Sequence, residues 1–283
     1  MNIQWFPGHM TKALRMMQEE FKVIDAAVYV IDSRAPFSCI NPEFTKLIKD
    51  KPIIYALNKA DITDLTEVKK WAKYFESDNS VAVILNSTLT NSTVEIIRQA
   101  KFLLRERIAK YAAKNIKMAV RLMIIGVPNS GKSTLINNMC GKYKTITGNK
   151  PGVTKGKQWV TLSSGIEVLD TPGTLWPSFE NKQVAKNLAY IGSIKDDILD
   201  NVELALEFIT DCKNLNVFTE RYGVTNLTAP PHEILNEICI KRGYVLKGGE
   251  IDTLRGAKSV IDDFRKGRLG KIILEKAEDF NKL

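Results

Sequence analysis

Two short motifs in this chain have residue types and spacing that could grip a purine nucleotide. The first is NKAD at residues 58–61, where the Asp61 carboxylate can accept two hydrogen bonds from the N1–H and 2-amino groups of guanine. Adenine lacks that pair of donors and would leave the carboxylate unpaired, which is costly. The aliphatic stem of Lys59 can lie on the plane of the base.

The second motif is GVPNSGKS at residues 126–133, which fits the GxxxxGK pattern, followed by Ser or Thr, of a phosphate-binding loop. Its glycines let backbone N–H groups approach phosphates, and the following helix directs its positive end at them. Lys132 would reach the β- and γ-phosphates, and the Ser133 hydroxyl would bind Mg²⁺. The loop residues predicted to contact nucleotide are Asn129, Ser130, Gly131, Lys132, Ser133 and Thr134.

Further groups complete the predicted phosphate site. DTPG at residues 170–173 would place Asp170 on Mg²⁺ and the Gly173 amide at the γ-phosphate. Thr154, between the phosphate-binding loop and DTPG, can supply a second hydroxyl to the metal. Lys132, Thr154 and Gly173 therefore belong to the predicted catalytic set.

A third polar segment, Asn-Ser-Thr at residues 86–88, follows an expected strand and could close the other face of the base with backbone amides. The residues predicted to contact the base are Asn58, Lys59, Asp61, Asn86, Ser87 and Thr88.

The elements that must position these motifs are alternating strands and helices. We expect strands at 26–31, 53–57, 81–85, 120–125 and 166–169, and helices at 11–21, 65–75, 92–107 and 134–140. Alternation of this kind predicts an α/β fold, a mostly parallel sheet with helices on both faces. Ligands of such sheets bind at the carboxyl ends of the strands, where the motif residues lie.

The order of the motifs is the reverse of the usual one, because NKAD comes before the phosphate-binding loop. This order predicts a circularly permuted P-loop GTPase domain in which residues 105–117 bridge the original ends. From about residue 182 the pattern becomes helical, with glycines as punctuation. We therefore expect a GTPase domain at 1–178 and an all-helical domain at 179–283.

Composition limits the classes of protein that remain. The chain has 44% hydrophobic residues, enough for a core, and a net charge of +9 that favours an acidic partner such as nucleic acid. Four scattered cysteines without metal-ligand spacing, and the lack of a secretory signal pattern, predict a reduced, cytosolic protein. The apolar runs have strand length, so no membrane span is expected.

The motif order, with WFPGHM at residues 5–10 and DSRAP at residues 32–36, resembles the circularly permuted GTPases of the bacterial ribosome biogenesis GTPase A family. The similarity continues through KRG at 241–243, KGG at 247–249 and FRKGRLG at 264–270, and so covers nearly the whole chain. The resemblance implies a cytoplasmic GTPase that matures the large ribosomal subunit and grips ribosomal RNA with its C-terminal helical domain. Neither DNA nor a membrane is an expected partner.

Two predictions concern how hydrolysis is driven. The loop after DTPG has Thr174 and Leu175 where Ras-type GTPases carry a water-orienting Gln, so another group must act. His9, beside Gly8, could swing toward the γ-phosphate, and the resemblance points to the same residue. Asn129 resembles the loop asparagine that binds K⁺ in related GTPases, with a role in shaping the turn as the alternative.

Residues 241–271 carry nine cations against four carboxylates, which predicts contact with RNA phosphates, although a solvated helical face is the alternative. Two functions fit these features. The first is a ribosome-assembly GTPase whose low intrinsic turnover is raised by the large subunit. The second is a GTP-regulated RNA-binding module in which hydrolysis is incidental.

Overall fold

The structure, a computed structural model, describes residues 8–48, 50–89, 91–141, 158–162, 165–176, 179 and 181–280, without the side chains of residues 8–10, 91–92 and 158. Contacts divide the described chain into two compact units. The sheet unit consists of residues 8–176 with 273–280, and the helical unit of residues 179–272.

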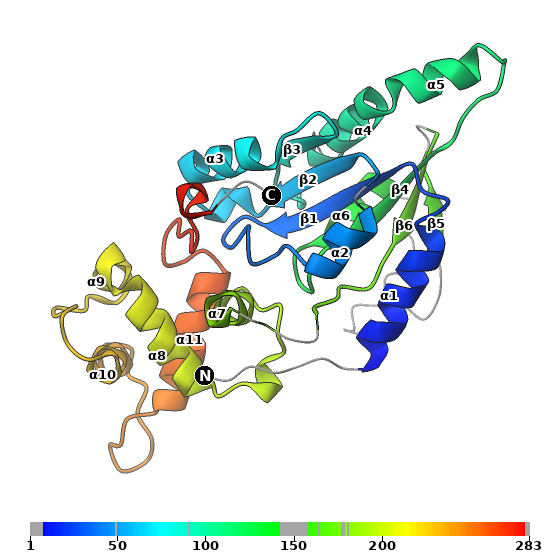
Figure 1. Ribbon diagram of the computed structural model, residues 1–283. Helices are drawn as coiled ribbons and strands as arrows, with labels where there is room; N and C mark the ends of the chain where they lie inside the picture. Colours follow the sequence, from blue (N-terminus) through cyan, green and yellow to red (C-terminus); the bar gives the residue numbers. More distant parts are fainter. Residues whose placement is uncertain are drawn as a thin grey trace. The chain divides into compact units, whose positions relative to one another are not determined.

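The sheet unit is built on a six-stranded sheet in the order β3-β2-β1-β4-β6-β5 (Figure 1). Its strands are β1 (Ala26–Asp32), β2 (Ile53–Asn58), β3 (Ser80–Ile84), β4 (Val120–Ile125), β5 (Gln158–Thr161) and β6 (Ile166–Asp170). Neighbouring strands are parallel except β5, which runs antiparallel to β6. The predicted mostly parallel α/β sheet is confirmed. Sequence patterns missed β5, because a strand of four residues shows too little periodicity to be recognised.

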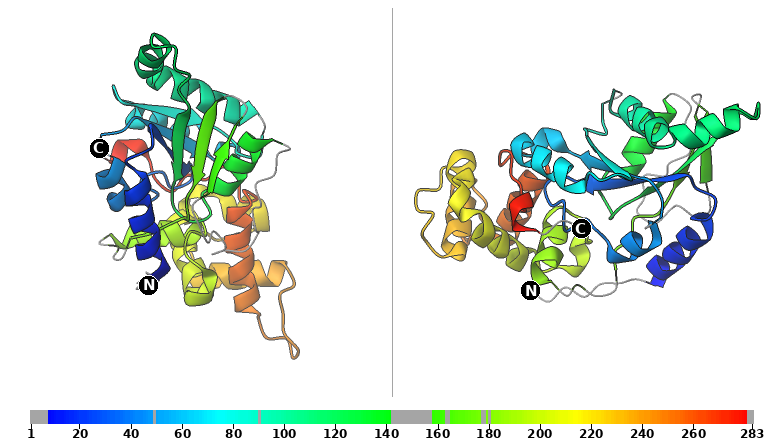
Figure 2. Two further views of the ribbon diagram at one scale, coloured as in Figure 1. Left: turned by 90° about the vertical axis from the view of Figure 1, so that its right-hand side faces the viewer. Right: turned by 45° about the horizontal axis from the view of Figure 1, so that its top comes forward.

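Helices cover both faces of this sheet. They are α1 (Gly8–Glu20), α2 (Pro42–Ile48), α3 (Leu65–Phe75), α4 (Asn91–Leu103), α5 (Arg105–Ala112) and α6 (Lys132–Cys140), with the 3₁₀ turn η1 (Ala60–Ile62). On one face, Ile96 of α4 and Leu135 of α6 belong to the same buried apolar cluster as Val28 of β1. On the other face, Phe75 of α3 stacks on Tyr55 of β2 at 4.5 Å between ring centroids. Figure 2 shows α1 and α2 on one side of the sheet.

The helix expected at 92–107 is two helices. Leu104 separates them with φ −98° and ψ 9°, while its side chain, 5% exposed, packs into the core. No glycine or proline marks this break, which is why the sequence pattern did not show it. Beyond the break, α5 buries none of its residues and projects past the sheet (Figure 1).

The helical unit contains α7 (Lys182–Tyr190), α8 (Asn201–Cys212), α9 (Val217–Tyr222), α10 (Pro231–Lys241) and α11 (Thr253–Arg265), with 3₁₀ turns η2 (Asp196–Ile198) and η3 (Lys213–Leu215). Its core is aromatic: the Phe208 ring lies 4.7 Å from Phe264 and 5.2 Å from Tyr190. The predicted helical character of this part is confirmed. In neither unit does a described helix have both the length and the apolar run needed to cross a membrane.

After the helical unit the chain returns to the sheet unit, ending in the 3₁₀ turn η4 (Ala277–Asp279). Glu275, 5% exposed, accepts hydrogen bonds from the backbone N–H groups of Phe37 at 2.7 Å and Ser38 at 3.1 Å. Trp71 Nε1 donates to the Glu275 carbonyl at 2.9 Å, and the Phe280 ring stacks on Phe37 at 4.3 Å. The described tail, residues 273–280, therefore packs outside the helical unit, although the sequence assigned all of 179–283 to one domain.

Candidate nucleotide-binding site

A pocket of about 440 Å³ opens at the carboxyl ends of β2, β3 and β4. It is lined by Lys59, Asp61, Ile62, Asn86, Ser87, Thr88, Asn129, Gly131, Lys132, Ser133 and Thr134. All except Ile62 were singled out by the sequence motifs. Parallel pairing brings them together, because the register sets Asp32 opposite Asn58 and so aligns the strand ends at one edge.

The loop from β4 to α6 takes backbone conformations that favour glycine at two points. Gly126 has φ 148° and Gly131 has φ 102°. A Cβ on Gly126 would lie 2.4 Å from the carbonyl oxygen of Val30, and one on Gly131 would lie 2.1 Å from Asn58 Nδ2. The two glycines therefore let the loop pass tightly against β1 and β2, which leaves the amino end of α6 at the pocket.

Lys132, the first residue of α6, is 6% exposed. Its Nζ donates to the Val127 carbonyl at 2.7 Å, within its own loop. Burial lowers the pKa of Lys132 to about 8, and the nearby Asp170 carboxylate opposes part of that shift. Phosphate oxygens would stabilise this buried ammonium far better than a carbonyl does. Lys132 is therefore suited to leave the Val127 carbonyl and bind a phosphate oxygen instead.

Asp170 ends β6, and its Oδ1 is buried with no hydrogen-bond partner among the described residues. Burial raises the pKa of Asp170, while the Lys132 ammonium opposes that rise. A buried, unpartnered carboxylate oxygen is a ligand that a hard cation takes, so Asp170 and the Ser133 hydroxyl fit the predicted Mg²⁺. A Cβ on Gly173 would lie 2.8 Å from both Lys132 Nζ and Pro128 Cα, so the DTPG segment passes directly over the phosphate-binding loop.

Asn58 joins the loops around the pocket without lining it. Its side chain, 1% exposed, donates from Nδ2 to the Ser130 carbonyl at 2.7 Å and accepts from the Ser87 N–H at 2.8 Å. Asn138 of α6 adds a bond that the sequence did not suggest, from its Nδ2 to the Ser87 carbonyl. Both amides fix the phosphate-binding loop relative to the 86–88 loop.

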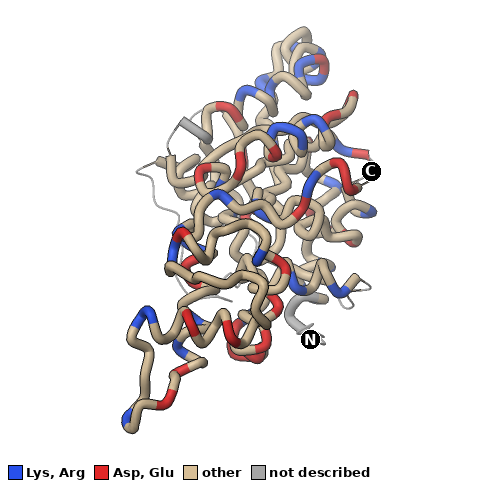
Figure 3. The backbone as a smooth tube through the Cα atoms, turned by 90° about the vertical axis from the view of Figure 1, so that its left-hand side faces the viewer, with Lys and Arg blue, Asp and Glu red and all other residues tan. Residues whose placement is uncertain are grey.

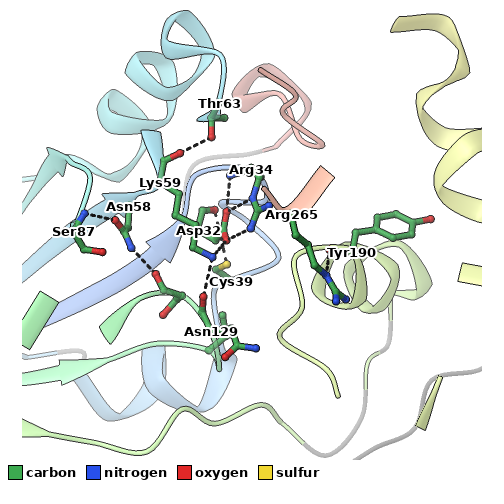
Figure 4. Close-up of polar contacts among 12 residues, drawn as sticks. Asp32, Arg34, Cys39, Asn58, Lys59, Thr63, Ser87, Asn129, Tyr190 and Arg265 are labelled. Carbon is green, nitrogen blue, oxygen red and sulfur yellow. Dashed lines mark hydrogen bonds and ion pairs between the residues drawn. The ribbon is translucent and has the colours of Figure 1, made fainter. Parts of the chain in front are cut away.

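Lys59 is held by a buried acid from the neighbouring strand (Figure 4). Its backbone is left-handed, with φ 61°, and its Nζ donates to Asp32 Oδ2 at 2.8 Å and to the Asn129 carbonyl at 2.9 Å. Arg34 also binds Asp32, through Nε at 2.9 Å and Nη2 at 2.6 Å. Burial works against the Asp32 charge, but Arg34 and Lys59 hold the pKa of Asp32 well below its usual range.

Asp32 is the functional residue that sequence reasoning missed. It was seen as part of the DSRAP motif, but the pattern gave it no role. Here it fixes the lysine expected to lie on the base, whereas the Asp61 carboxylate stays exposed at the pocket wall, open to a ligand.

Several predicted residues are not part of the described pocket. Thr154 lies outside the described residues, and so does the side chain of His9, whose backbone belongs to the first turn of α1. Ser130 is fully buried, and its Oγ has no partner among the residues described. Thr174 and Leu175 are also fully buried, so neither side chain is exposed where a water-orienting Gln would act.

Part of the basic run at 241–271 is engaged inside the helical unit. Arg265 binds Asp196 through two hydrogen bonds of 2.7 and 2.8 Å. Lys266 pairs with Asp262 at 2.9 Å, and Arg268 pairs with Asp263 at 3.2 Å. These three cations are therefore less available to RNA than their spacing suggested.

Known proteins are similar to this chain in sequence and in fold. Residues 121–231 match the family described as 50S ribosome-binding GTPase. The chain is 40% identical to ribosome biogenesis GTPase A of Bacillus licheniformis, covering 99% of this chain and 100% of that protein. It is 38% identical to the protein of the same name from Bacillus cereus, covering 99% and 96%.

The fold is similar to the crystal structure described as GNP-bound YlqF from T. maritima, with a TM-score of 0.65, 26% identity and coverage of 95% and 100%. A second structure of that protein, described as GDP-bound, matches with the same TM-score and 25% identity. Sequence and fold thus agree with the pocket and its motif residues. The chain belongs to the ribosome biogenesis GTPase A family and is a GTP-hydrolysing enzyme.

Proposed function

We propose that this protein hydrolyses GTP during maturation of the large ribosomal subunit, binds ribosomal RNA, and turns over slowly until the particle stimulates it. The observation that carries the proposal is the pocket that Asp61 and Lys132 share, although their motifs stand in reversed order along the chain. The names of the relatives support a role in ribosome assembly. The proposed compartment is the cytoplasm.

In the proposed complex, Asp61 accepts from guanine and the Lys59 stem lies on the base. The support for this arrangement is the ion pair that anchors Lys59 Nζ to Asp32 at 2.8 Å and so restricts the stem. Asn86, Ser87 and Thr88 form another wall of the same pocket. Guanine specificity follows, because only a base with two adjacent donors satisfies the Asp61 carboxylate.

Hydrolysis proceeds by attack of water on the γ-phosphorus, with breakage of the bond to the β–γ bridging oxygen and release of GDP and inorganic phosphate. Lys132 offsets charge on the phosphate oxygens, and the Gly173 N–H donates to the γ-phosphate. The support for the role of Gly173 is that its backbone passes directly over the phosphate-binding loop. Mg²⁺, held by Ser133, Asp170 and Thr154, would supply further positive charge at the β- and γ-phosphates. K⁺ at Asn129 stays a prediction, tested by turnover in potassium against sodium.

A water-positioning group is still needed. Thr174 and Leu175, which directly follow DTPG, are fully buried, so neither of these two residues offers one. We assign this part to His9, in the first turn of α1, where a ribosomal surface would direct its side chain to the γ-phosphate.

The test is multiple-turnover GTP hydrolysis with and without large ribosomal subunits, paired with co-sedimentation in GTP and in GDP. The proposal expects stimulated turnover and nucleotide-dependent association with the large subunit. Association without stimulation would favour the alternative, an RNA-binding module in which hydrolysis is incidental. If the protein showed no association with the large subunit and no stimulated turnover, both functions would be overturned.

A further inference from the structure

The net positive charge of this chain comes from residues outside the helical unit. Residues 179–272 carry fourteen Lys and Arg against fourteen Asp and Glu, so the helical unit has no net charge. Residues 98–117 carry seven cations and one carboxylate, a net of +6 in a chain whose total is +9. We call this segment the basic arm; its cations are Arg98, Lys101, Arg105, Arg107, Lys110, Lys114 and Lys117. A second basic stretch, 142–157 with five lysines, lies outside the described residues.

The outer part of the basic arm has a defined conformation although no described segment covers it. Every residue from 109 to 117 is exposed, yet the helix ends in a defined turn. Asn115 has φ 55° and donates its N–H to the Ala112 carbonyl at 2.9 Å, and the Ile116 N–H donates to the Tyr111 carbonyl at 3.0 Å. This is a Schellman cap. Helices this short normally depend on packing, so a capped but unpacked helix is suited to a surface that a partner completes.

Within the described part of the chain, most cations of the basic arm are not paired with a carboxylate. Arg107 fastens the arm to Asp25 at 2.8 Å, and Arg98 pairs with Glu95 at 2.7 Å. The other five form no ion pair with a carboxylate among the described residues; they are Lys101, Arg105, Lys110, Lys114 and Lys117. Figure 3 shows Lys and Arg recurring along α5 at the top of the view. Like charges on successive turns repel, and a bound polyanion would relieve that repulsion.

The base of the basic arm also presents an aromatic ring. Phe102 is 54% exposed, and the Arg105 guanidinium lies 4.5 Å from its ring centroid. Phe102, Arg105 and Lys110 line a hollow of about 600 Å³ beside the turn at 77–81. An acidic protein surface needs only the charges, whereas nucleic acid uses phosphate-binding cations together with an exposed ring on which a base can stack.

We propose that the basic arm is an RNA-binding surface of this protein, with Lys110, Lys114 and Lys117 on the phosphates. That the RNA is ribosomal rests on the proposed function; the surface itself rests on charge, exposure and the Phe102 hollow. The proposal moves the main RNA contact from the 241–271 run to the sheet unit. It also places RNA binding on the segment that bridges the permuted ends of the GTPase domain.

The test measures binding of the full chain to large-subunit ribosomal RNA over a range of salt concentrations. The arm variant is K110Q/K114Q/K117Q, and the matched control is K247Q/K258Q/K271Q, which removes three exposed lysines from the helical unit. We expect the arm variant to bind about 10- to 100-fold more weakly at 0.1 M salt, with a log–log salt slope shallower by roughly two to three. K110R/K114R/K117R should restore binding, which separates charge from folding.

Three results would count against the basic arm. Unchanged affinity and slope in the arm variant, with RNA binding intact in the wild type, overturns the arm alone. A larger loss in the helical-unit control returns the contact to the 241–271 run. A wild-type chain that does not bind this RNA at all overturns the proposed function together with the arm. GTP affinity should be equal in all variants, because none of the substituted residues lines the nucleotide pocket.

Discussion

Lys59 of the guanine motif and Asp32 at the end of β1 form an ion pair of 2.8 Å, with the carboxylate 1% exposed. Asp32 also binds Arg34, whose backbone carbonyl accepts a hydrogen bond from the Leu274 N–H at 2.8 Å. Lys59, the lysine proposed to contact the base, is thus connected through Asp32 and Arg34 to the returning tail. All of these residues belong to the sheet unit, so its proposed base site and its tail form one bonded network.

Replacing Asp32 by Asn should destabilise the fold, because Arg34 would stay buried beside an amide that cannot balance its charge. We expect a loss of about 3–5 kcal/mol in the free energy of unfolding. Since Arg34 and Lys59 hold the pKa of Asp32 well below its usual range, this stabilisation is complete above an ordinary pKa of about 3.9 and is lost as pH falls toward the folded value. Urea unfolding should show a smaller difference in unfolding free energy between the variant and the wild type at pH 3 than at pH 7.

The control for Asp32 is Asp50→Asn, at an exposed position. It should change the unfolding free energy by less than about 0.5 kcal/mol. If Asp32→Asn were equally mild, the buried network would not contribute to stability.

Glu275→Ala should also be destabilising, by about 2–4 kcal/mol, because the N–H groups of Phe37 and Ser38 would lose a buried acceptor. Glu278 offers a control in the same tail, since its ion pair with Lys70 is 3.7 Å long and its side chain is 62% exposed. Glu278→Ala should cost less than about 0.5 kcal/mol. Equal urea midpoints for the two variants would show that the tail is not a stabilising part of the sheet unit.

Five of the six strands could be predicted because each of them is a compact apolar run with a motif residue at or just after its end, whereas β5 is not such a run. Helix 65–75 was predicted with the bounds that the structure has, and Asp64 caps it by accepting from the Thr66 N–H at 2.8 Å. The pairing of Asp32 with Lys59 could not be predicted, because it depends on the register of β1 against β2. Nor could the burial of Glu275, which looks like an ordinary surface carboxylate in a charged tail.

Asp61→Asn should exchange a carboxylate acceptor for an amide and so favour xanthine over guanine nucleotides. The expected loss in GTP binding is about 3 kcal/mol, or roughly 10²-fold, because a charge-assisted pair is broken. Competition binding with GTP and XTP checks it, and Asp64→Asn outside the pocket is the control. An unchanged preference for GTP would remove Asp61 from the base site.

Lys132 should make nucleotide binding depend on pH. Burial lowers its pKa to about 8, and phosphates stabilise the ammonium, so the pKa must rise when nucleotide binds. Binding above pH 8 therefore takes up a proton, and GDP affinity should fall by up to about tenfold per pH unit there. Calorimetry at pH 8.5 in two buffers of different ionisation enthalpy measures the uptake.

The lowered pKa of Lys132 also determines how the stability of the folded protein changes with pH. Because the folded pKa of Lys132 lies below its ordinary 10.5, the nucleotide-free protein should gain stability as pH rises from about 8 toward 10.5. Lys132→Arg is the control for proton uptake, since a guanidinium does not titrate in this range. Binding heats that are independent of buffer in the wild type would contradict the assignment.

His9→Ala should lower subunit-stimulated kcat by about 10²-fold while leaving GTP affinity unchanged, as expected for a group that orients water only in the transition state. The structural reason is the burial of Thr174 and Leu175, the two residues directly after DTPG, neither of which has an exposed side chain to do this. The control is His232→Ala, which alters the only other histidine, at an exposed position of the helical unit. Full stimulated turnover in His9→Ala would remove His9 from the mechanism. A parallel loss of GTP affinity would instead assign it a role in folding, because a water-positioning group has no part in ground-state nucleotide binding.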